Sequence, residues 1–286
     1  MSALELAAGG SDAAALDLRH AALVDLLSGL PSLVVAYSGG VDSAYLAVAA
    51  TEVLGDRVLC VTAESASYPE RHREMALAVA RQFGLRHEFL ATQELERPEY
   101  RANAPDRCYH CKHELYSQLS ALAARLGYGA IADGSNADDR GDYRPGRKAA
   151  REFGVISPLD AVGLTKSDIR ALSQAAGLPT WDEPASACLS SRIPYYSEVS
   201  VEKLRAIEAA EDVLRREGFR VLRVRHHGDM ARIEVGRDEM PRLVEPSTAD
   251  RVDAAIRALG FKHVVIDLRG YRLGSLNEGL RLTAIP

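Results

Sequence analysis

The 286-residue sequence lacks the long apolar runs, the basic leader and the excess of positive charge that would direct a chain to a membrane or to nucleic acid. No apolar stretch approaches the roughly 20 residues that a helix needs to cross a bilayer. Residues 1–6 contain neither a basic region nor a sustained apolar core, so no signal peptide is expected. The net charge of −5 argues against sequence-independent binding of nucleic acid. We therefore expect a cytoplasmic protein without a membrane partner, and nucleic acid is not an expected partner.

Two common nucleotide motifs are also missing. The pattern Gly-x4-Gly-Lys-Ser/Thr, which transfers a γ-phosphate, occurs nowhere in the chain. A Gly-x-Gly-x-x-Ala match at residues 127–132 precedes a predicted strand and opens no helix, so it is not a dinucleotide fingerprint. If the chain binds a nucleotide, it must do so with a different loop.

Cysteine is scarce, with four residues: Cys60, Cys108, Cys111 and Cys188. In a cytoplasmic protein, cysteines at such spacings favour a metal site or catalysis over disulfides. Cys60 lies within an apolar run, and we expect it to be a small buried hydrophobic residue. The other three cysteines are therefore the candidates for chemistry.

The most informative pattern is Ser-Gly-Gly-Val-Asp-Ser at residues 38–43. Residues 33–37 are apolar and β-branched, which predicts a buried parallel strand, and residues 43–50 favour a helix. Glycines let the backbone approach a phosphate, and the N–H groups and dipole of the helix attract its charge. Ser38 and Ser43 add hydroxyl donors, and Asp42 could hold Mg²⁺. The pattern thus predicts a phosphate cradle between a strand and a helix.

Strands and helices alternate from residue 33 to about residue 184. The predicted strands cover residues 58–63, 87–92 and 130–133, and the predicted helices cover residues 70–83 and 110–126. This order predicts a parallel sheet wound by helices, with ligands beyond the carboxyl ends of the strands. The motifs that follow the first, second and fourth strands should therefore converge on one crevice.

The pattern changes beyond about residue 195. A strongly amphipathic helix over residues 199–217 is followed by strands at 220–226, 230–235 and 263–268 and by a helix at 248–259. We expect a small α+β domain in which helices pack on an antiparallel sheet. The sequence therefore predicts an α/β nucleotide-binding domain over residues 16–194 and a small domain over residues 195–286. Residues 1–15, rich in alanine and glycine, are expected to be disordered.

The three remaining cysteines allow several kinds of site. Cys108 and Cys111 lie at the entry to a predicted helix, and Cys188 lies in a Pro/Ser-rich segment. Three thiolates can hold three irons of a 4Fe–4S cluster and leave the fourth iron open. A Zn²⁺ site with His110 or His113 as the fourth ligand is an equally good interpretation. In a third interpretation, Cys108 and Cys111 bind no metal and have no catalytic role.

Residues 38–43 resemble the pyrophosphate loop (PP-loop) of the N-type ATP pyrophosphatases, which implies cleavage of ATP between its α- and β-phosphates. Six segments together resemble the LarE family, ATP-dependent sulfur transferases that make the nickel-pincer nucleotide cofactor of lactate racemase. These are residues 37–43, 107–112 (Arg-Cys-Tyr-His-Cys-Lys), 133–139, 142–146, 184–194 (Pro-Ala-Ser-Ala-Cys-Leu-Ser-Ser-Arg-Ile-Pro) and 270–278. The match covers nearly the whole chain beyond the first 15 residues.

The resemblance implies a definite reaction. ATP adenylylates the carboxylates of pyridinium-3,5-biscarboxylate mononucleotide, pyrophosphate leaves, and a sulfur nucleophile converts each carboxylate into a thiocarboxylate. In one variant of the family, the cysteine corresponding to Cys188 gives up its own sulfur. In the other variant, three cysteines hold a 4Fe–4S cluster whose open iron carries sulfide. Because Cys108 and Cys111 accompany Cys188, we expect the cluster variant.

The motifs, the positions of the residues and the resemblance together suggest roles for residues of this chain. The expected catalytic residues are Cys188, Asp42 and Glu211. ATP is expected at Ser38, Gly39, Gly40, Asp42, Ser43, Asn136 and Lys166; the substrate at Arg192, Arg223 and Arg225; iron–sulfur at Cys108, Cys111 and Cys188; and Mg²⁺ at Asp42 and Asp138. Further expected partners are a sulfide donor protein and other copies of this chain in a homo-oligomer.

Simpler interpretations of several of these residues remain open. Arg223 and Arg225 alternate on a predicted strand and could line a solvated sheet face. Glu211 and Lys166 could be solvated surface residues. Two acidic residues near Asn136, Asp139 and Asp142, could be structural. The adjacent His226 and His227 point to opposite faces of a strand, which suits a single metal poorly.

Two rival functions also remain open. A tRNA thiolase of the same superfamily could carry a three-cysteine cluster, but the acidic net charge and the C-terminal resemblance count against it. An adenine-nucleotide-binding module without catalysis would leave Asp42 and the thiols without a purpose. Retention of RNA with a steep salt dependence would favour the first rival, and release of pyrophosphate would exclude the second.

Overall fold

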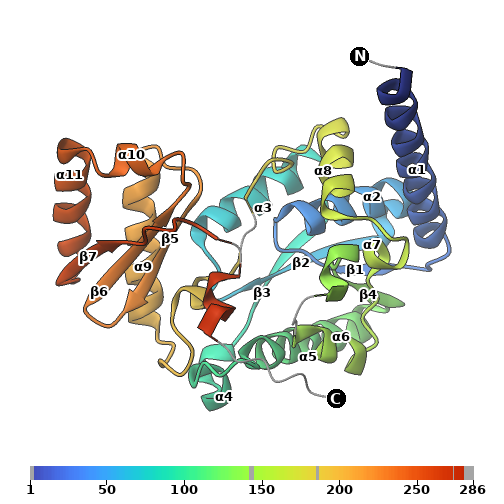
Figure 1. Ribbon diagram of the computed structural model, residues 1–286. Coiled ribbons are helices and arrows are strands. Elements are labelled where there is room, and N and C mark those ends of the chain that lie inside the picture. The colour runs from blue at the N-terminus through green and yellow to red at the C-terminus, as the bar shows by residue number, and fades with distance from the viewer. Residues whose placement is uncertain (1–2, 142–144, 185–186, 273, 280–286) are drawn as a thin grey trace. The chain divides into compact units, whose positions relative to one another are not determined.

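The computed structural model describes residues 3–141, 145–184, 187–272 and 274–279 (Figure 1). Asp142, one of the expected structural acids, lies outside the described residues. The chain forms two compact units, each of which is built from two stretches of sequence. The first unit comprises Met1–Glu94 and Cys108–Glu183, and the second comprises Leu95–Arg107 and Pro184–Pro286.

A parallel four-stranded sheet forms the centre of the first unit, with the strand order β3-β2-β1-β4. The strands are β1 (Leu33–Ala36), β2 (Val58–Glu64), β3 (His87–Ala91) and β4 (Ala130–Ala132). The helices are α1 (Ala3–Ser28), α2 (Val41–Leu54), α3 (Glu70–Gln82), α5 (Arg107–Leu126), α6 (Gly146–Glu152), α7 (Pro158–Ala161) and α8 (Lys166–Ala175). The predicted α/β fold with a helix-wound parallel sheet is confirmed. Helix α1 begins at Ala3, inside residues 1–15, for which the composition predicts disorder. The disorder of residues 1–15 stays a prediction.

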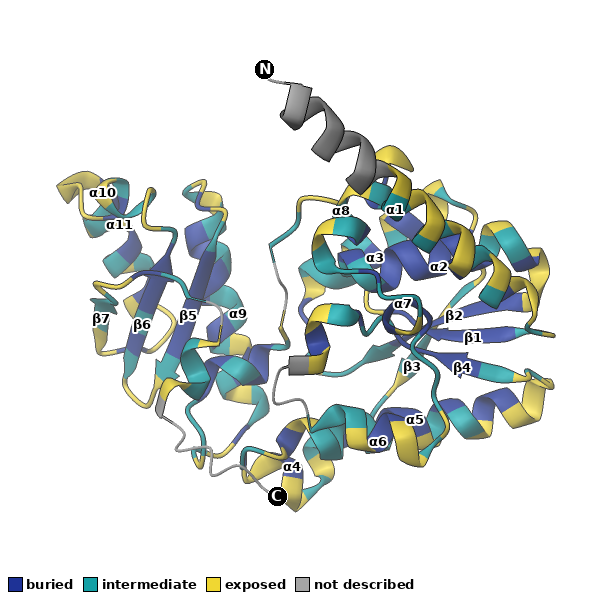
Figure 2. Cartoon of the chain, turned by 45° about the vertical axis from the view of Figure 1, so that its right-hand side comes forward, coloured by how far each residue is buried: buried dark blue, intermediate teal, exposed yellow. Residues whose placement is uncertain are grey.

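Both faces of this sheet are covered by helices, as Figure 1 shows. Side chains alternate along each strand, so Val34 and Leu59 pack against α5 and α6 while Val35 and Cys60 pack with α1, α2 and α8. β1 and most of β2 are buried on both sides (Figure 2), which explains their continuous apolar runs, whereas the edge strand β3 has no buried residue. Cys60 is fully buried, as expected, and burial raises the pKa of its thiol to about 12.

The strand order places a topological switch beside β1. From β1 the chain moves to β2 on one side, and it later returns to β4 on the other side. In parallel α/β sheets, loops diverge at such a point and leave a crevice beyond the carboxyl ends of the two strands. The segment at residues 38–43 follows β1 directly and therefore lies at this switch point.

The second unit contains a three-stranded sheet of order β5-β6-β7. Its elements are α4 (Pro98–Arg101), α9 (Val201–Arg216), β5 (Leu222–His227), β6 (Met230–Val235), α10 (Met240–Leu243), α11 (Pro246–Arg257) and β7 (His263–Ile266). β5 and β6 are antiparallel, but β6 and β7 are parallel. The expectation of a purely antiparallel sheet is therefore wrong. α11 makes a crossover between β6 and β7, so the chain enters β7 in the direction in which it left β6.

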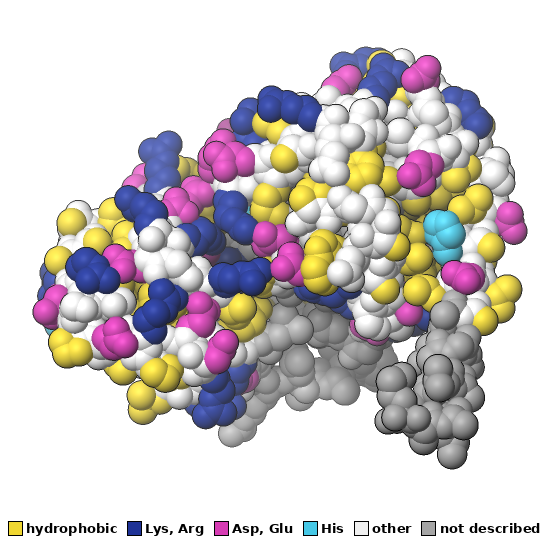
Figure 3. Space-filling model, turned by 90° about the horizontal axis from the view of Figure 1, so that it is seen from above, with side chains coloured by type: hydrophobic (Ala, Val, Ile, Leu, Met, Phe, Trp, Pro, Cys, Tyr) yellow, Lys and Arg dark blue, Asp and Glu magenta, His cyan; other side chains and the backbone are white. Residues whose placement is uncertain are grey.

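Among the described residues, the structure contains no helix that is both long and apolar enough to traverse a bilayer. The face of the molecule in Figure 3 carries lysine and arginine side chains next to aspartate and glutamate side chains. Several exposed charged residues of the chain form ion pairs, such as Arg257 with Asp253 and Lys262 with Asp229. Pairs of this kind contribute little to stability, about 0–1 kcal/mol each.

Candidate nucleotide site and cysteine loop

The loop between β1 and α2 has the backbone that the sequence predicts. Gly39 has a φ of +72°, a backbone conformation that residues other than glycine rarely adopt. A Cβ added to Gly39 would also lie only 2.9 Å from the Cβ of Ala76. Gly40 is the N-cap residue of α2, and no side chain caps this helix end. The first N–H groups of α2 are thereby left for an anionic ligand. This arrangement fits a phosphate, as the motif predicts.

The two serines of this loop hold its shape. The Ser43 hydroxyl accepts a hydrogen bond from the backbone N–H of Ser38 at 3.1 Å and donates to the carbonyl of Gly40 at 3.1 Å. The hydroxyls of Ser38 and Ser43 lie 3.1 Å apart. Ser43 is buried and Ser38 is exposed. The structure therefore gives Ser43 a role in closing the loop and leaves the Ser38 side chain exposed.

Asp42 and Lys166 meet at this loop although 124 residues separate them. The Lys166 Nζ lies 2.6 Å from Asp42 Oδ2. Lys166 is the first residue of α8, where a capping box between Thr165 and Asp168 fixes the start of the helix. The Lys166 ammonium is therefore paired with a loop carboxylate, although its side chain is still 31% exposed.

The loop after β4 packs on the same loop. A Cβ added to Gly134 would lie 2.9 Å from the backbone N of Ser43, so only glycine allows this approach. Asn136 is buried, and its Oδ1 accepts from the N–H of Asp138 at 3.0 Å. Asp138 Oδ2 accepts from the N–H of Lys166 at 2.8 Å. Asp139 is buried and accepts from the N–H of Asn136 at 3.1 Å, which agrees with a structural role.

The segment after β2 supplies a contact that the sequence did not reveal. The Tyr68 hydroxyl donates to the carbonyl of Ser38 at 3.0 Å. The only signal was positional, because Tyr68 follows the strand that lies beside β1. The loops after β1, β2 and β4 thus meet, as the order of strands predicts.

The cysteine pair lies inside α5. The helix begins at Arg107, earlier than predicted, so Cys108 and Cys111 occupy its first turns with a spacing that puts them on one face. Cys108 is exposed and Cys111 is partly exposed. The ring of His113, an expected alternative Zn²⁺ ligand, packs edge-on against Phe153 with the ring centres 5.0 Å apart.

Cys188 belongs to the second unit and is partly exposed. Its carbonyl accepts from the N–H of Ser191 at 3.0 Å, from the Ser191 hydroxyl at 2.8 Å and from Arg192 Nη1 at 3.0 Å. Arg192 Nη1 also donates to the carbonyl of Ala187 at 2.6 Å. The backbone around Cys188 is therefore held by a side chain four residues further along the chain.

Glu211 is not a solvated helix residue, because it is fully buried. Its carboxylate accepts from Arg192 Nε at 2.8 Å, from Arg192 Nη2 at 3.2 Å and from Arg215 Nη2 at 2.9 Å. The N–H of Val224 adds a fourth bond at 3.2 Å. Burial raises the pKa of Glu211, but the neighbouring arginines, Arg192 first among them, lower it by a larger amount. The net pKa of Glu211 is therefore below its usual value. Glu211 is thus a carboxylate that holds Arg192 in place.

Arg223 and Arg225 project from one face of β5, as predicted, but both are buried, so this face is not solvated. Arg225 donates to both oxygens of the fully buried Glu234, at 3.1 and 2.7 Å, and to the carbonyl of Ser191 at 2.8 Å. Burial and the charge of Arg192 lower the pKa of Arg223 to about 10. Sequence reasoning missed Glu234, which lies opposite Arg223 in the register of β5 and β6 and on the same face of the sheet as Arg225.

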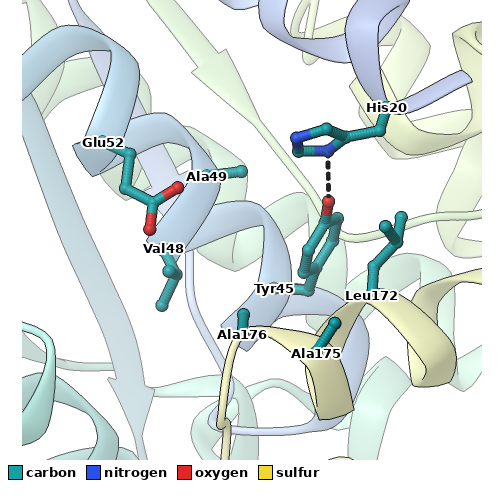
Figure 4. A pocket seen from close by; sticks show the side chains of 8 residues that line it. All are labelled: His20, Tyr45, Val48, Ala49, Glu52, Leu172, Ala175 and Ala176. Atoms are coloured by element: carbon teal, nitrogen blue, oxygen red, sulfur yellow. Dashed lines mark hydrogen bonds between the residues drawn. The ribbon is translucent and has the colours of Figure 1, made fainter. Parts of the chain in front are cut away.

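A cavity of about 190 Å³ lies elsewhere on the first unit, between α1, α2 and α8 (Figure 4). His20 Nδ1 and the Tyr45 hydroxyl, 2.8 Å apart, form a hydrogen bond in it, and Val48, Ala49 and Leu172 supply apolar walls. None of the expected site residues lines this cavity.

Asp42 offers a test of the expected Mg²⁺. Its Oδ2 is paired with Lys166, but its buried Oδ1 has no hydrogen-bond partner among the described residues. A buried, unpaired carboxylate oxygen is costly unless a cation or donor satisfies it. Asp42 therefore fits a Mg²⁺ ligand. In the described parts of the chain, no group of three or more His, Cys, Asp or Glu residues is arranged to hold a metal ion.

Comparisons with known proteins agree with this geometry. A sequence model of the NAD synthase family matches residues 12–104, which include the phosphate loop. An uncharacterised protein of Synechocystis is 43% identical over 88% of this chain and 94% of that protein. An uncharacterised protein of Methanocaldococcus jannaschii is 28% identical over 84% of this chain and 90% of that protein.

A further relative has a named activity. The pyridinium-3,5-bisthiocarboxylic acid mononucleotide synthase of Lactiplantibacillus plantarum is 37% identical over 93% of this chain and 96% of that enzyme. The similarity spans both units, including the phosphate loop and the Cys188 segment. The chain therefore belongs to the LarE family of sulfur transferases.

Proposed function

We propose that this protein is an ATP-dependent sulfur transferase that adenylylates the carboxylates of pyridinium-3,5-biscarboxylate mononucleotide and converts them into thiocarboxylates. The observation that carries the proposal is the phosphate loop with its Asp42–Lys166 pair, in a chain 37% identical to a synthase named for the bisthiocarboxylic product. This loop can hold a nucleoside triphosphate by its phosphates. The family relationship supplies the acceptor.

The proposed first step activates a carboxylate. A carboxylate resists nucleophiles because it is already anionic and would have to expel oxide. A substrate oxygen attacks the α-phosphorus of ATP, the bond between the α-phosphorus and the bridging oxygen breaks, and pyrophosphate leaves. The N–H groups at the start of α2 and the Lys166 ammonium would stabilise the charge that accumulates on the leaving pyrophosphate. Mg²⁺, held by Asp42 Oδ1, would neutralise the phosphate oxygens further, and Asp138 is the second proposed ligand.

The proposed substrate site lies in the second unit. Arg192, Arg215, Arg223, Arg225 and Arg232 surround two fully buried glutamates, Glu211 and Glu234. Arg215 also pairs with Asp212, and Arg232 lies 3.9 Å from Asp267, so the excess positive charge is that of the buried Arg192, Arg223 and Arg225 over the two glutamates. Burial first, and then the charge of Arg192, lowers the pKa of Arg223. The phosphate and two carboxylates of the substrate would supply the missing negative charge, with Arg223 and Arg225 nearest to the phosphate.

The proposed sulfur step uses Cys188 together with Cys108 and Cys111. Each of the three thiols is partly or fully exposed, which supports the proposal because a cluster could reach each of them, although the three are not gathered into a metal site among the residues that the structure describes. When bound, a 4Fe–4S cluster would supply a transferable sulfide at the iron that no cysteine ligates. The chain's own contribution is to present the thiols, since Arg192 holds the backbone of Cys188 and α5 holds the pair. The sulfur displaces AMP from the activated carboxyl, and the thiocarboxylate remains.

The experiment that tests the proposal combines two assays on anaerobically purified protein. Pyrophosphate release with the biscarboxylate nucleotide tests activation, and iron and acid-labile sulfide analysis tests the cluster. We expect near-stoichiometric cluster in the wild type, its loss in Cys108→Ala, and its retention in the control Cys60→Ala, which removes a buried thiol outside the site. In Cys188→Ala we expect pyrophosphate release without thiocarboxylate.

Two results would contradict parts of this proposal. If no pyrophosphate appears with the biscarboxylate nucleotide, the reaction itself is wrong. If pyrophosphate and thiocarboxylate appear but the protein cannot be loaded with iron, the cluster is wrong. In that case Cys188 should lose about the mass of H₂S after one turnover, as in the sacrificial variant of the family.

A further inference from the structure

The segment Leu95–Arg107 belongs to the second unit although the chain on both sides of it belongs to the first. Buried side chains attach this segment to the loop that carries Cys188. Asn103 is fully buried and donates through Nδ2 to the carbonyls of Ile193, Pro194 and Ser197, at 3.2, 2.8 and 3.0 Å. Its left-handed backbone, with a φ of 54°, marks a position under local constraint.

Two further contacts reach Ser190, two residues after Cys188. The buried Tyr100 hydroxyl lies 2.6 Å from the Ser190 hydroxyl. Arg107 Nη1 donates to the carbonyl of Ser190 at 2.9 Å and also to Asn103 Oδ1. Arg107 is only 3% exposed, so its guanidinium has left water to make these bonds. Burying a charged guanidinium costs free energy unless its N–H groups find acceptors. The acceptors on Asn103 and Ser190 therefore fix where the Arg107 side chain lies.

Arg107 is also the residue next to Cys108. A trans peptide bond sets the Cα atoms of Arg107 and Cys108 about 3.8 Å apart. Arg107 therefore carries a side chain bonded to the Cys188 loop and a backbone bonded to the first residue of the cysteine pair.

We propose that Arg107 is a positioning residue that holds the start of the Cys108–Cys111 pair in register with the Cys188 loop. The inference rests on the proposed function, since it requires that the three thiols serve one site. Arg107 touches neither the substrate nor the sulfur in this proposal. It acts by fixing where the backbone of α5 begins relative to Ser190, as outer-shell partners fix the ligands of metal sites.

The test uses Cd²⁺ as a probe of the three thiols in the full-length, metal-free, reduced protein. Thiolate-to-cadmium charge transfer in the ultraviolet reports how many thiolates bind, and Cys188→Ser measures the share of Cys188 in that signal. The variant is Arg107→Lys, which keeps the charge but not the directed guanidinium geometry. The matched control is Arg101→Lys on the same segment, because Arg101 forms an exposed pair with Glu198 at 2.5 Å.

We expect the wild type and Arg101→Lys to bind Cd²⁺ through three thiolates. Arg107→Lys should lose the Cys188 share of the signal and bind Cd²⁺ roughly 10- to 100-fold more weakly, the usual effect of removing an outer-shell partner. If Arg107→Lys does not fold, Arg107→Gln, which removes the charge that would otherwise be buried without its bonds, should show the same loss of the Cys188 signal.

The outcomes separate this inference from the proposed function. Three thiolates in the wild type and also in Arg107→Lys, with unchanged affinity, would overturn the role of Arg107 and leave the three-cysteine site standing. An unchanged signal in Arg107→Gln would do the same if that variant has to be used. If Cys188→Ser gives the same cadmium signal as the wild type, Cys188 does not share the site with the cysteine pair. That result would overturn both the shared site and the role of Arg107.

Discussion

Replacement of Glu211 should destabilise the second unit far more than replacement of its neighbour Asp212. Glu211→Ala removes the acceptor of four hydrogen bonds at 2.8, 3.2, 2.9 and 3.2 Å. It also leaves Arg192, which is 2% exposed, with an unpaired charge. Removal of one partner from a buried ion pair costs about 3–5 kcal/mol of unfolding free energy.

Asp212 provides the matched comparison on the same helix. Its side chain is 50% exposed and makes one ion pair with Arg215 at 2.7 Å. Such a pair contributes about 0–1 kcal/mol. We therefore expect Glu211→Ala to lose at least about 2 kcal/mol more than Asp212→Ala, measured as the shift in urea unfolding followed by circular dichroism. Equal losses in the two variants would refute the view that Glu211 holds Arg192.

The same carboxylate predicts a pH dependence. Burial raises the pKa of Glu211, the arginines lower it by more, and the net pKa lies below the usual 4.5. A depressed pKa in the folded state means that the stabilisation is fully present above about pH 4.5 and is lost as the pH falls through the folded-state pKa. The difference in unfolding free energy between the wild type and Glu211→Gln should therefore narrow below about pH 4.5. A constant difference down to pH 3 would contradict this.

Two further predictions concern the phosphate loop. Gly39→Ala adds a Cβ that would lie 2.9 Å from that of Ala76, whereas Gly154→Ala, at a similar positive φ, meets nothing within 4 Å. Both should lose about 1–2 kcal/mol of stability from the backbone, but only Gly39→Ala should also weaken ATP binding in a calorimetric titration; equal ATP affinities would show that the loop tolerates the clash. Lys166→Met removes the 2.6 Å pair with Asp42 and should slow pyrophosphate release by about 100-fold or more. A rate within a few-fold of the wild type would exclude Lys166 from the activation step.

The local chemistry of this protein can be predicted from short stretches of its sequence. The phosphate loop follows from three local features: an apolar strand, a Gly-Gly turn and a stretch of residues that favour a helix. Each of these features depends only on neighbouring residues. The alternation of strands and helices likewise predicts the parallel sheet, and the structure confirms both. The direction of β7 could not be predicted in this way, because a crossover helix reverses a pairing that looks antiparallel along the chain.

The partners of charged residues depended on contacts between distant parts of the chain. In sequence, Lys166, Glu211 and Arg223 look like ordinary surface residues, and nothing local to them indicates burial. The structure pairs Lys166 with Asp42 across 124 positions, and it packs α9 on β5 so that Glu211 meets buried arginines. The residue types and the backbone of the loop at residues 38–43 were thus determined by the sequence alone, because local backbone preferences set them. The tertiary structure decided which charged side chains pair with one another and which groups Arg107 binds. The reason is that desolvation and ion pairing act between elements that come together only when the chain folds.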